Sequence, residues 1–168
     1  MRDIEAVQRS FTSRITGVVH LDYWDRLKEL DLYSLERRRE RYLILYIYKI
    51  LLGLVPNFNE DRYKIKSTYS ERRGLYINLP SIRTSATCRV KAMVERSFAV
   101  RAPKLFNALP KSIRKGNLSF NSFKYQLDKI LCKVKDEPSF PNLRPQAISN
   151  SLIDQFDIMK RDGSYYCL

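Results

Sequence analysis

Residues 34–54, SLERRRERYLILYIYKILLGL, constrain the fold of this chain more than any other stretch. Ser34 is a good N-cap, no residue inside the run breaks a helix, and Gly53 supplies a stop near its end. Residues 42–54 are apolar on nearly every face except at Lys49, and a helix that is apolar all round is buried. The apolar part is shorter than the roughly 20 residues that a bilayer span needs. We therefore predict a core helix and no transmembrane segment.

The charge of the chain is concentrated in its middle. Lys and Arg number 31 against 18 Asp and Glu, which gives a net charge of +13 over 168 residues. Residues 56–135 carry eighteen basic and five acidic side chains, whereas residues 1–55 carry ten and eight and residues 136–168 carry three and five. Such a segment is typical of a protein that binds a polyanion, most often nucleic acid and less often an acidic membrane surface. A solvated basic face is the alternative that charge alone leaves open.

The cysteines and the N-terminus indicate an intracellular protein. Cys88, Cys132 and Cys167 are isolated and odd in number, which favours free thiols. The sequence shows neither a signal peptide nor a lipidation box. We expect a nuclear or cytoplasmic protein that is not secreted and has no attachment to a membrane.

Hydrophobic periodicity predicts helices before the core helix. Ile4, Val7, Phe11 and Ile15 recur at spacings of three and four, which predicts an amphipathic helix over residues 3–15. A second helix is expected over residues 20–30, where Asp22 provides the cap and Trp24, Leu27 and Leu30 point inward. We expect residues 1–58 to form a helical bundle.

The pattern changes after residue 58. Residues 59–118 are predicted to form a basic hairpin and irregular region, with strands near 63–67 and 75–79, a SERRG turn at 70–74 and a short helix over 102–108. Residues 119–135 form a closing helix with Phe123, Leu127, Ile130 and Leu131 on one face. Residues 136–168 are expected to be an extended or disordered tail. The predicted class is α+β, mainly α, with residues 1–135 as a single compact domain.

No sequence motif indicates an active site. Phosphate-binding loops, paired Cys and His ligands and the common hydrolase and metalloprotease motifs are all missing from the sequence. Asp61 beside Glu60 is a weak candidate for the carboxylate pair that a magnesium-dependent polymerase needs. We therefore predict no catalytic residues, no metal site, no cofactor and no small-molecule substrate.

The middle segment fits nucleic-acid binding better. Cations that neutralise phosphates alternate there with rings that can stack on bases, as a single-strand or RNA-binding surface requires. Among the rings Tyr69, Tyr76, Phe98 and Phe106, the last three are better explained as core residues, which leaves the cations as the informative part. The predicted nucleic-acid-binding residues are Arg72, Arg73, Arg83, Arg89, Lys91, Arg96, Arg101, Lys104, Lys111, Arg114 and Lys115.

Several blocks of sequence resemble one known family. The chain is similar to the C-terminal region of the reverse transcriptase polyprotein of non-LTR, LINE-type, jockey-like retrotransposons. The similar blocks cover most of residues 3–137: IEAVQRSFTSRI at 4–15, YWDRLKELDLYSLERRRER at 23–41, YKILLGL at 48–54, GLYINLP at 74–80, RT at 83–84, SF at 97–98, LFNALPKSIR at 105–114 and SFNSFKYQLDKIL at 119–131. One departure is Phe106, where the family usually has tryptophan. Another lies in the long helix, where the family often reads RRxRxDLI and this chain has Arg39-Glu40-Arg41-Tyr42-Leu43-Ile44.

The resemblance implies a piece of a polymerase without its catalytic part. The fingers, the palm and its metal-binding motif precede this region in such polyproteins, and Met1 would fall in the last part of the thumb. The implied function is a non-catalytic fragment of an RNA-directed DNA polymerase that grips template RNA or primer duplex. Two alternatives stay open: a protein-interaction module that packs on the absent polymerase core, and a pseudogene remnant without a selected role.

Overall fold

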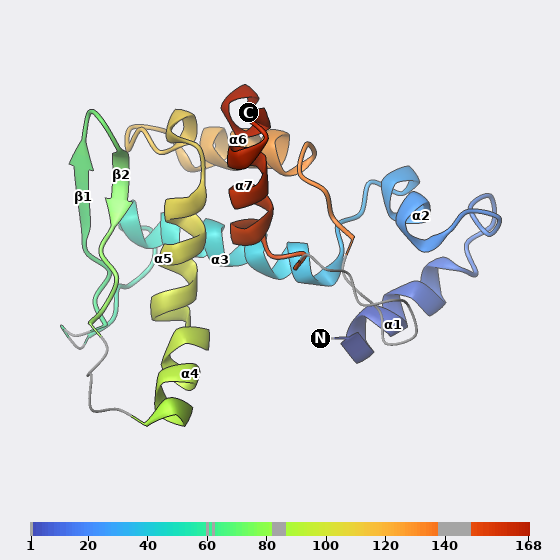
Figure 1. The fold of residues 1–168 in the computed structure, drawn as a ribbon, viewed down its shortest axis with the longest axis horizontal. Coiled ribbons are helices and arrows are strands. Elements are labelled where there is room, and N and C mark those ends of the chain that lie inside the picture. The colour runs from blue at the N-terminus through green and yellow to red at the C-terminus, as the bar shows by residue number, and fades with distance from the viewer. Residues whose placement is uncertain (1, 60, 62, 82–86, 138–148) are drawn as a thin grey trace.

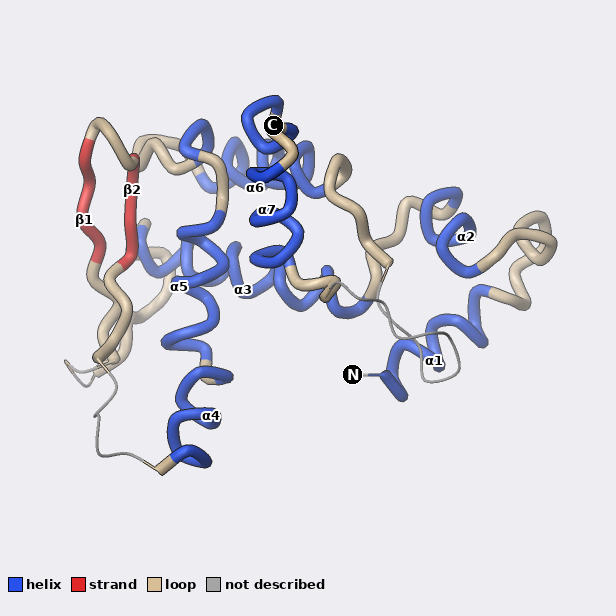
Figure 2. Tube along the Cα trace, viewed as in Figure 1, coloured by secondary structure: helices blue, strands red, loops and turns tan. Residues whose placement is uncertain are grey.

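The structure is a computed structural model that describes residues 2–59, 61, 63–81, 87–137 and 149–168. Within these ranges it contains seven α-helices, two short 3-10 helices and a two-stranded antiparallel sheet (Figures 1 and 2). The predicted class, α+β and mainly α, is confirmed. The elements in chain order are α1 (Arg2–Thr12), α2 (Tyr23–Glu29), α3 (Leu35–Leu51), β1 (Ser67–Ser70), β2 (Gly74–Ile77), α4 (Cys88–Arg96), α5 (Phe98–Ala108), η1 (Lys111–Ile113), α6 (Phe120–Leu131), α7 (Leu152–Arg161) and η2 (Ser164–Cys167).

The central helix α3 forms where the sequence predicts it. The Ser34 hydroxyl accepts a hydrogen bond from the Arg37 N–H at 3.0 Å and so caps the first turn. The helix ends just before Gly53, which adopts a left-handed φ of +71°. No helix in the described ranges has both the length and the apolar character that crossing a membrane requires.

Only part of the surface of α3 is buried. Ile44, Ile47 and Tyr48 are fully enclosed, whereas Tyr42 and Tyr46 are 59% and 49% exposed. The prediction that this helix is buried all round is therefore wrong for one face. Tyrosine has an apolar ring and a polar hydroxyl, so a tyrosine in an apolar run does not by itself indicate burial.

The core lies where α3 meets α5, α6 and α7. The rings of Tyr48 and Phe123 stack with centroids 3.8 Å apart, and Phe106 lies about 6 Å from both, at 6.3 and 6.1 Å. The Tyr48 hydroxyl donates to the Leu118 carbonyl at 2.7 Å, so its polar end is satisfied. In Figure 1, α5 and α7 cross in front of α3, which places these distant segments against one central helix. The predicted closing helix is confirmed as α6, with its four predicted apolar residues buried.

Helices α1 and α2 contact the chain around α3, as the predicted N-terminal bundle requires, but among the described residues the main core includes side chains of α3 and none of α1 or α2. Helices α1 and α2 lie beside the N-terminal end of α3, and the buried pair Tyr23 and Leu27 forms a small separate cluster (Figure 1). The apolar side chains of α1 face outward, and its polar side faces the protein. Glu5 is buried there, where it accepts hydrogen bonds from the Tyr23 hydroxyl at 2.6 Å and the Leu35 N–H at 2.9 Å. Periodicity identified the amphipathic helix correctly but not which face packs.

The hairpin is confirmed, but its strands lie at other positions than predicted. Strand β1 pairs with β2 in the register Ser67↔Ile77 and Ser70↔Gly74, so the first strand begins later than expected. Residue 65 is excluded from the ladder because the Asn57 side chain binds both its N–H and its carbonyl, each at 2.9 Å. On the other side, the Asn107 amide binds the backbone N–H and carbonyl of Ile77 at 2.9 and 2.8 Å and so fixes β2 to α5.

The helical region before residue 109 is longer than the predicted 102–108. Helix α5 begins at Phe98 and continues through Pro103, and α4 precedes it. Proline has no amide hydrogen, so one helical hydrogen bond is missing at this point. Five other side chains of α5 are buried, and this packing outweighs the local preference against proline: Ala99, Val100, Ala102, Leu105 and Phe106.

The predicted extended tail over 136–168 is wrong for its last part. Helix α7 inserts Leu152 and Phe156 into the core, where both are fully buried. Its N-terminus is capped from α3, because Glu40 accepts hydrogen bonds from the Leu152 N–H at 2.8 Å and the Ser151 hydroxyl at 2.9 Å. Glu40 lies more than a hundred positions before Leu152 in the chain, so no local sequence pattern predicts this cap. The prolines that suggested a tail fall in 138–148, outside the described residues.

Candidate functional site

The predicted binding residues do not form one surface. Arg72 and Arg73 lie in the hairpin turn, and Lys111 and Lys115 lie on and after η1 beside it. Arg89, Lys91 and Arg96 lie on α4, at the opposite end of the view in Figure 1, and Lys104 is exposed on α5. Arg83 lies outside the described residues.

Two of the predicted residues have structural contacts instead. Arg114 donates hydrogen bonds to the backbone carbonyls of Leu109 and Leu75 at 2.9 and 2.8 Å, and burial lowers its pKa below the ordinary value. Arg101 forms an ion pair with the buried carboxylate of Glu40 at 3.1 Å. Both guanidinium groups hold elements of this fold together, which leaves them poorly placed to bind phosphate.

The hairpin end contains a small cavity of about 380 Å³. The cations Lys111 and Lys115 line it, together with one ring, Tyr69, and one carboxylate, Glu71. Gly74 is required at this point because it has a φ of +72° and a Cβ there would lie 2.8 Å from the Arg114 carbonyl oxygen. The cavity combines attraction and repulsion for an anion, so it is a weaker phosphate site than its lysines alone suggest.

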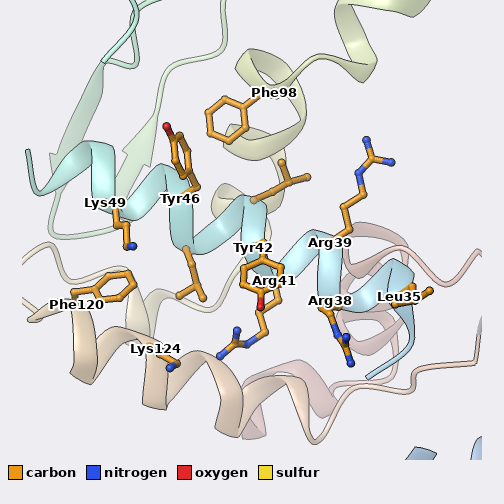
Figure 3. A pocket seen from close by; sticks show the side chains of 12 residues that line it. Leu35, Arg38, Arg39, Arg41, Tyr42, Tyr46, Lys49, Phe98, Phe120 and Lys124 are labelled. Carbon is orange, nitrogen blue, oxygen red and sulfur yellow. The ribbon is translucent and has the colours of Figure 1, made fainter. Parts of the chain in front are cut away.

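A larger groove runs along the exposed face of α3 (Figure 3). Its volume is about 760 Å³, within the range typical of ligand sites. Figure 3 shows α3 as its floor, with Phe98 from the start of α5 on one side and Phe120 and Lys124 from α6 on the other. The residues that line this groove, which we call the α3 groove, are Leu35, Arg38, Arg39, Arg41, Tyr42, Leu43, Leu45, Tyr46, Lys49, Phe98, Phe120 and Lys124.

The charge of the α3 groove is of one sign. Five of its side chains are cations, and none is a carboxylate. Arg41 is neutralised by Asp128, which accepts two hydrogen bonds from its guanidinium at 2.6 and 2.7 Å and raises the Arg41 pKa. Within the described part of the chain, no carboxylate lies in ion-pair distance of the other four groove cations: Arg38, Arg39, Lys49 and Lys124. These four charges are available to an anionic ligand.

The α3 groove is also rich in rings. Tyr46 and Phe98 meet edge to face, with centroids 5.4 Å apart, and the Lys49 ammonium lies 4.9 Å from the centroid of Phe120. Tyr42 lies one helical turn before Tyr46 and is more exposed. Exposed rings beside unpaired cations offer both contacts that a nucleic-acid strand needs, stacking and charge neutralisation.

Sequence reasoning missed this site because it assigned the two halves of α3 to different roles. Arg38 and Arg39 were not among the predicted binding residues, and residues 42–54 were predicted to be core. The signal is the helical spacing itself, since positions 38, 42, 46 and 49 share one face of a helix. Along that face two tyrosines, Tyr42 and Tyr46, lie between two cations, Arg38 and Lys49.

Comparison of the chain with models of known protein families, with curated proteins and with solved structures found no match in any of the three. Among the described residues, no group of three or more His, Cys, Asp or Glu side chains is placed to hold a metal ion.

Proposed function

We propose that this chain binds the phosphate backbone of nucleic acid through the α3 groove. The observation that carries the proposal is the set of four groove cations without a carboxylate partner in the described structure, beside exposed rings. Each cation that neutralises a phosphate releases condensed counterions, which makes binding favourable and dependent on salt. Such contacts position a strand without reading its sequence.

The resemblance to retrotransposon reverse transcriptases suggests a context for this activity. In that context the chain is the non-catalytic C-terminal part of an RNA-directed DNA polymerase, and the α3 groove holds template RNA or primer. The chemistry of this part is binding, and the parent polymerase supplies catalysis. The main contact is then the face of α3 and not the predicted binding residues of the middle segment, which run from Arg72 to Lys115.

The test is fluorescence anisotropy of the purified chain with a labelled single-stranded RNA, repeated from low to physiological salt. Each phosphate contact on a single strand adds about −0.7 to the slope of log affinity against log salt. Changing Arg38, Arg39, Lys49 and Lys124 to alanine should therefore make the slope shallower by about 2.8 and weaken binding at every salt concentration.

The matched control removes four exposed cations of the rival surface, Arg72, Arg73, Lys111 and Lys115. We expect the slope of log affinity against log salt to change by less than about 0.7 in the control, the value for one phosphate contact. The proposal would be contradicted if the slope became shallower in the control variant and stayed unchanged in the groove variant. That result would place the binding site at the hairpin end. Binding that is weak and insensitive to salt in the unmodified chain would contradict it as well.

A second candidate function is a protein-interaction module, favoured by one observation on α1. Ile4, Val7 and Phe11 form an apolar stripe on this helix, and all three side chains are more than half exposed. In this reading the stripe packs on the polymerase core of a parent or related reverse transcriptase. It predicts poor solubility of the isolated chain and RNA binding that is weak and insensitive to salt.

A further inference from the structure

The rings of the α3 groove are placed for more than phosphate binding. Tyr42 and Tyr46 project from α3 on the face that the core leaves uncovered, between cations on both sides (Figure 3). Neither ring belongs to the buried core. An exposed ring contributes little to folding, so the stability of this protein does not explain two of them on one face.

The aromatic surface continues beyond α3. Phe98 meets Tyr46 edge to face and also lies near Phe58, with centroids 6.0 Å apart, so Phe98 joins rings from two other parts of the chain. On the other side of the groove, Phe120 lies under the Lys49 ammonium. The hairpin-end cavity, by contrast, has the single ring of Tyr69. Of the two cationic surfaces, the α3 groove alone combines several rings with charges of one sign.

This combination distinguishes single strands from duplexes. The bases of a single strand can turn outward and stack on aromatic side chains, whatever their sequence, because every base has a flat π-face. In a duplex the faces of the bases are covered by their neighbours, so rings on a protein surface find only sugars, phosphates and base edges. Phosphate contacts are available to both forms, whereas stacking contacts are available to the single strand.

We propose that the α3 groove selects single-stranded over double-stranded nucleic acid by stacking bases on Tyr42 and Tyr46. This inference rests on the proposed function, because the groove cations must first hold the backbone. To that function it adds the class of ligand, which is single-stranded nucleic acid of any sequence. An acidic protein segment is the competing ligand, and it would satisfy the cations without using the faces of the rings.

The test is a double variant, Tyr42→Leu with Tyr46→Leu, which removes both rings and keeps every cation. Binding is measured against a single-stranded RNA, the same strand annealed to its complement, inorganic polyphosphate and polyglutamate. The expected loss on the single strand is about five- to 150-fold for each base that no longer stacks. Affinity for duplex and polyphosphate should stay the same, and so should the salt slope on the single strand.

Two controls separate stacking from other causes. The double variant Tyr42→Phe with Tyr46→Phe keeps the rings and removes the hydroxyls, so it should bind the single strand as the unmodified chain does. Tyr125→Leu removes an exposed tyrosine of α6 that does not line the groove, and it should have no effect. Circular dichroism of each variant confirms that the fold is retained.

The outcomes distinguish failure of this inference from failure of the proposed function. The stacking inference would be overturned if the unmodified chain bound single strand and duplex with equal affinity. It would also be overturned if the leucine variant lost as much affinity for polyphosphate as for the single strand. Either result would leave phosphate binding by the groove uncontradicted. Tighter binding of polyglutamate than of single-stranded RNA would overturn it in favour of an acidic protein partner. Loss of the salt dependence itself would instead contradict the proposed function.

Discussion

Replacing Phe123 with alanine lowers the free energy of unfolding by about 3–5 kcal/mol, the range for a large aromatic side chain removed from a core. Phe123 is fully buried, and its ring stacks on Tyr48 at 3.8 Å. Its loss leaves a cavity between α3 and α6 and removes a contact of the three-ring stack. The measurement is urea unfolding followed by circular dichroism. Because many domains have a total stability of about 5–15 kcal/mol, this loss is a large fraction of the whole.

The matched control lies two residues away on the same helix. Tyr125 is 65% exposed, and its alanine variant should change stability by no more than about 0.5 kcal/mol. Similar losses in both variants would mean that the ring stack is not the centre of the core. For Phe123→Ala we expect a lower urea midpoint of unfolding. The slope of unfolding free energy against urea concentration should not change, because unfolding exposes about the same surface area.

Replacing Glu40 with alanine is expected to cost about 3 kcal/mol, chiefly through hydrogen bonds. Its carboxylate accepts from the Leu152 N–H and the Ser151 hydroxyl and pairs with Arg101. The side chain is enclosed, so alanine leaves buried donors without an acceptor, at about 1–3 kcal/mol each. We expect the loss of these hydrogen bonds to detach α7 from the core. The measurement is limited proteolysis, in which residues 149–168 should be cleaved faster than in the unmodified chain. Glu36→Ala, one turn earlier on α3, is the control and should cost less than about 1 kcal/mol.

Glutamine at position 40 separates the hydrogen bonds from the charge. Burial raises the pKa of Glu40 above its ordinary value of 4.5, against the opposing effect of its hydrogen bonds and of Arg37 and Arg101. The folded state therefore holds this proton more tightly than the unfolded state, and the titration favours folding at low pH. That contribution is lost as pH rises from 4.5 through the raised pKa. Because Glu40→Gln has no such titration, its stability relative to the unmodified chain should improve over the same range. A relative stability that falls with rising pH would contradict the raised pKa.

The sequence correctly predicted the helices whose caps and apolar faces depend on residues close together in the chain. Ser34 and Ser119 cap α3 and α6 through their own hydroxyls, and the apolar spacing of α6 matches its buried face. Helix α7 was missed because its cap is Glu40, a residue far away in the chain. The outward face of α1 was missed for a related reason. Periodicity shows that a helix has two faces, and the neighbouring surface decides which one is covered.

The candidate site was only partly predictable. Charge counting found cations in the middle segment, yet Arg101 and Arg114 bind groups of this protein, which only their three-dimensional neighbours reveal. Tyr42 and Tyr46 were counted as core because hydropathy does not distinguish a buried tyrosine from an exposed one. Their shared face with Arg38 was readable from the helical spacing. The spacing thus predicts the α3 side of the groove, whereas Phe98, Phe120 and Lys124 join it only through the packing of α5 and α6.

The measurement that tests the central claim most directly is the position of a bound strand on the protein. Backbone amide chemical shifts of the labelled chain are recorded while a short single-stranded RNA is added. The account predicts that the changes concentrate on residues 35–49 of α3, around Phe98 and over residues 120–124 of α6. Changes confined to the hairpin turn at 70–74 and to residues 111–117, with the shifts of α3 unchanged, would show that the α3 groove is not the binding site.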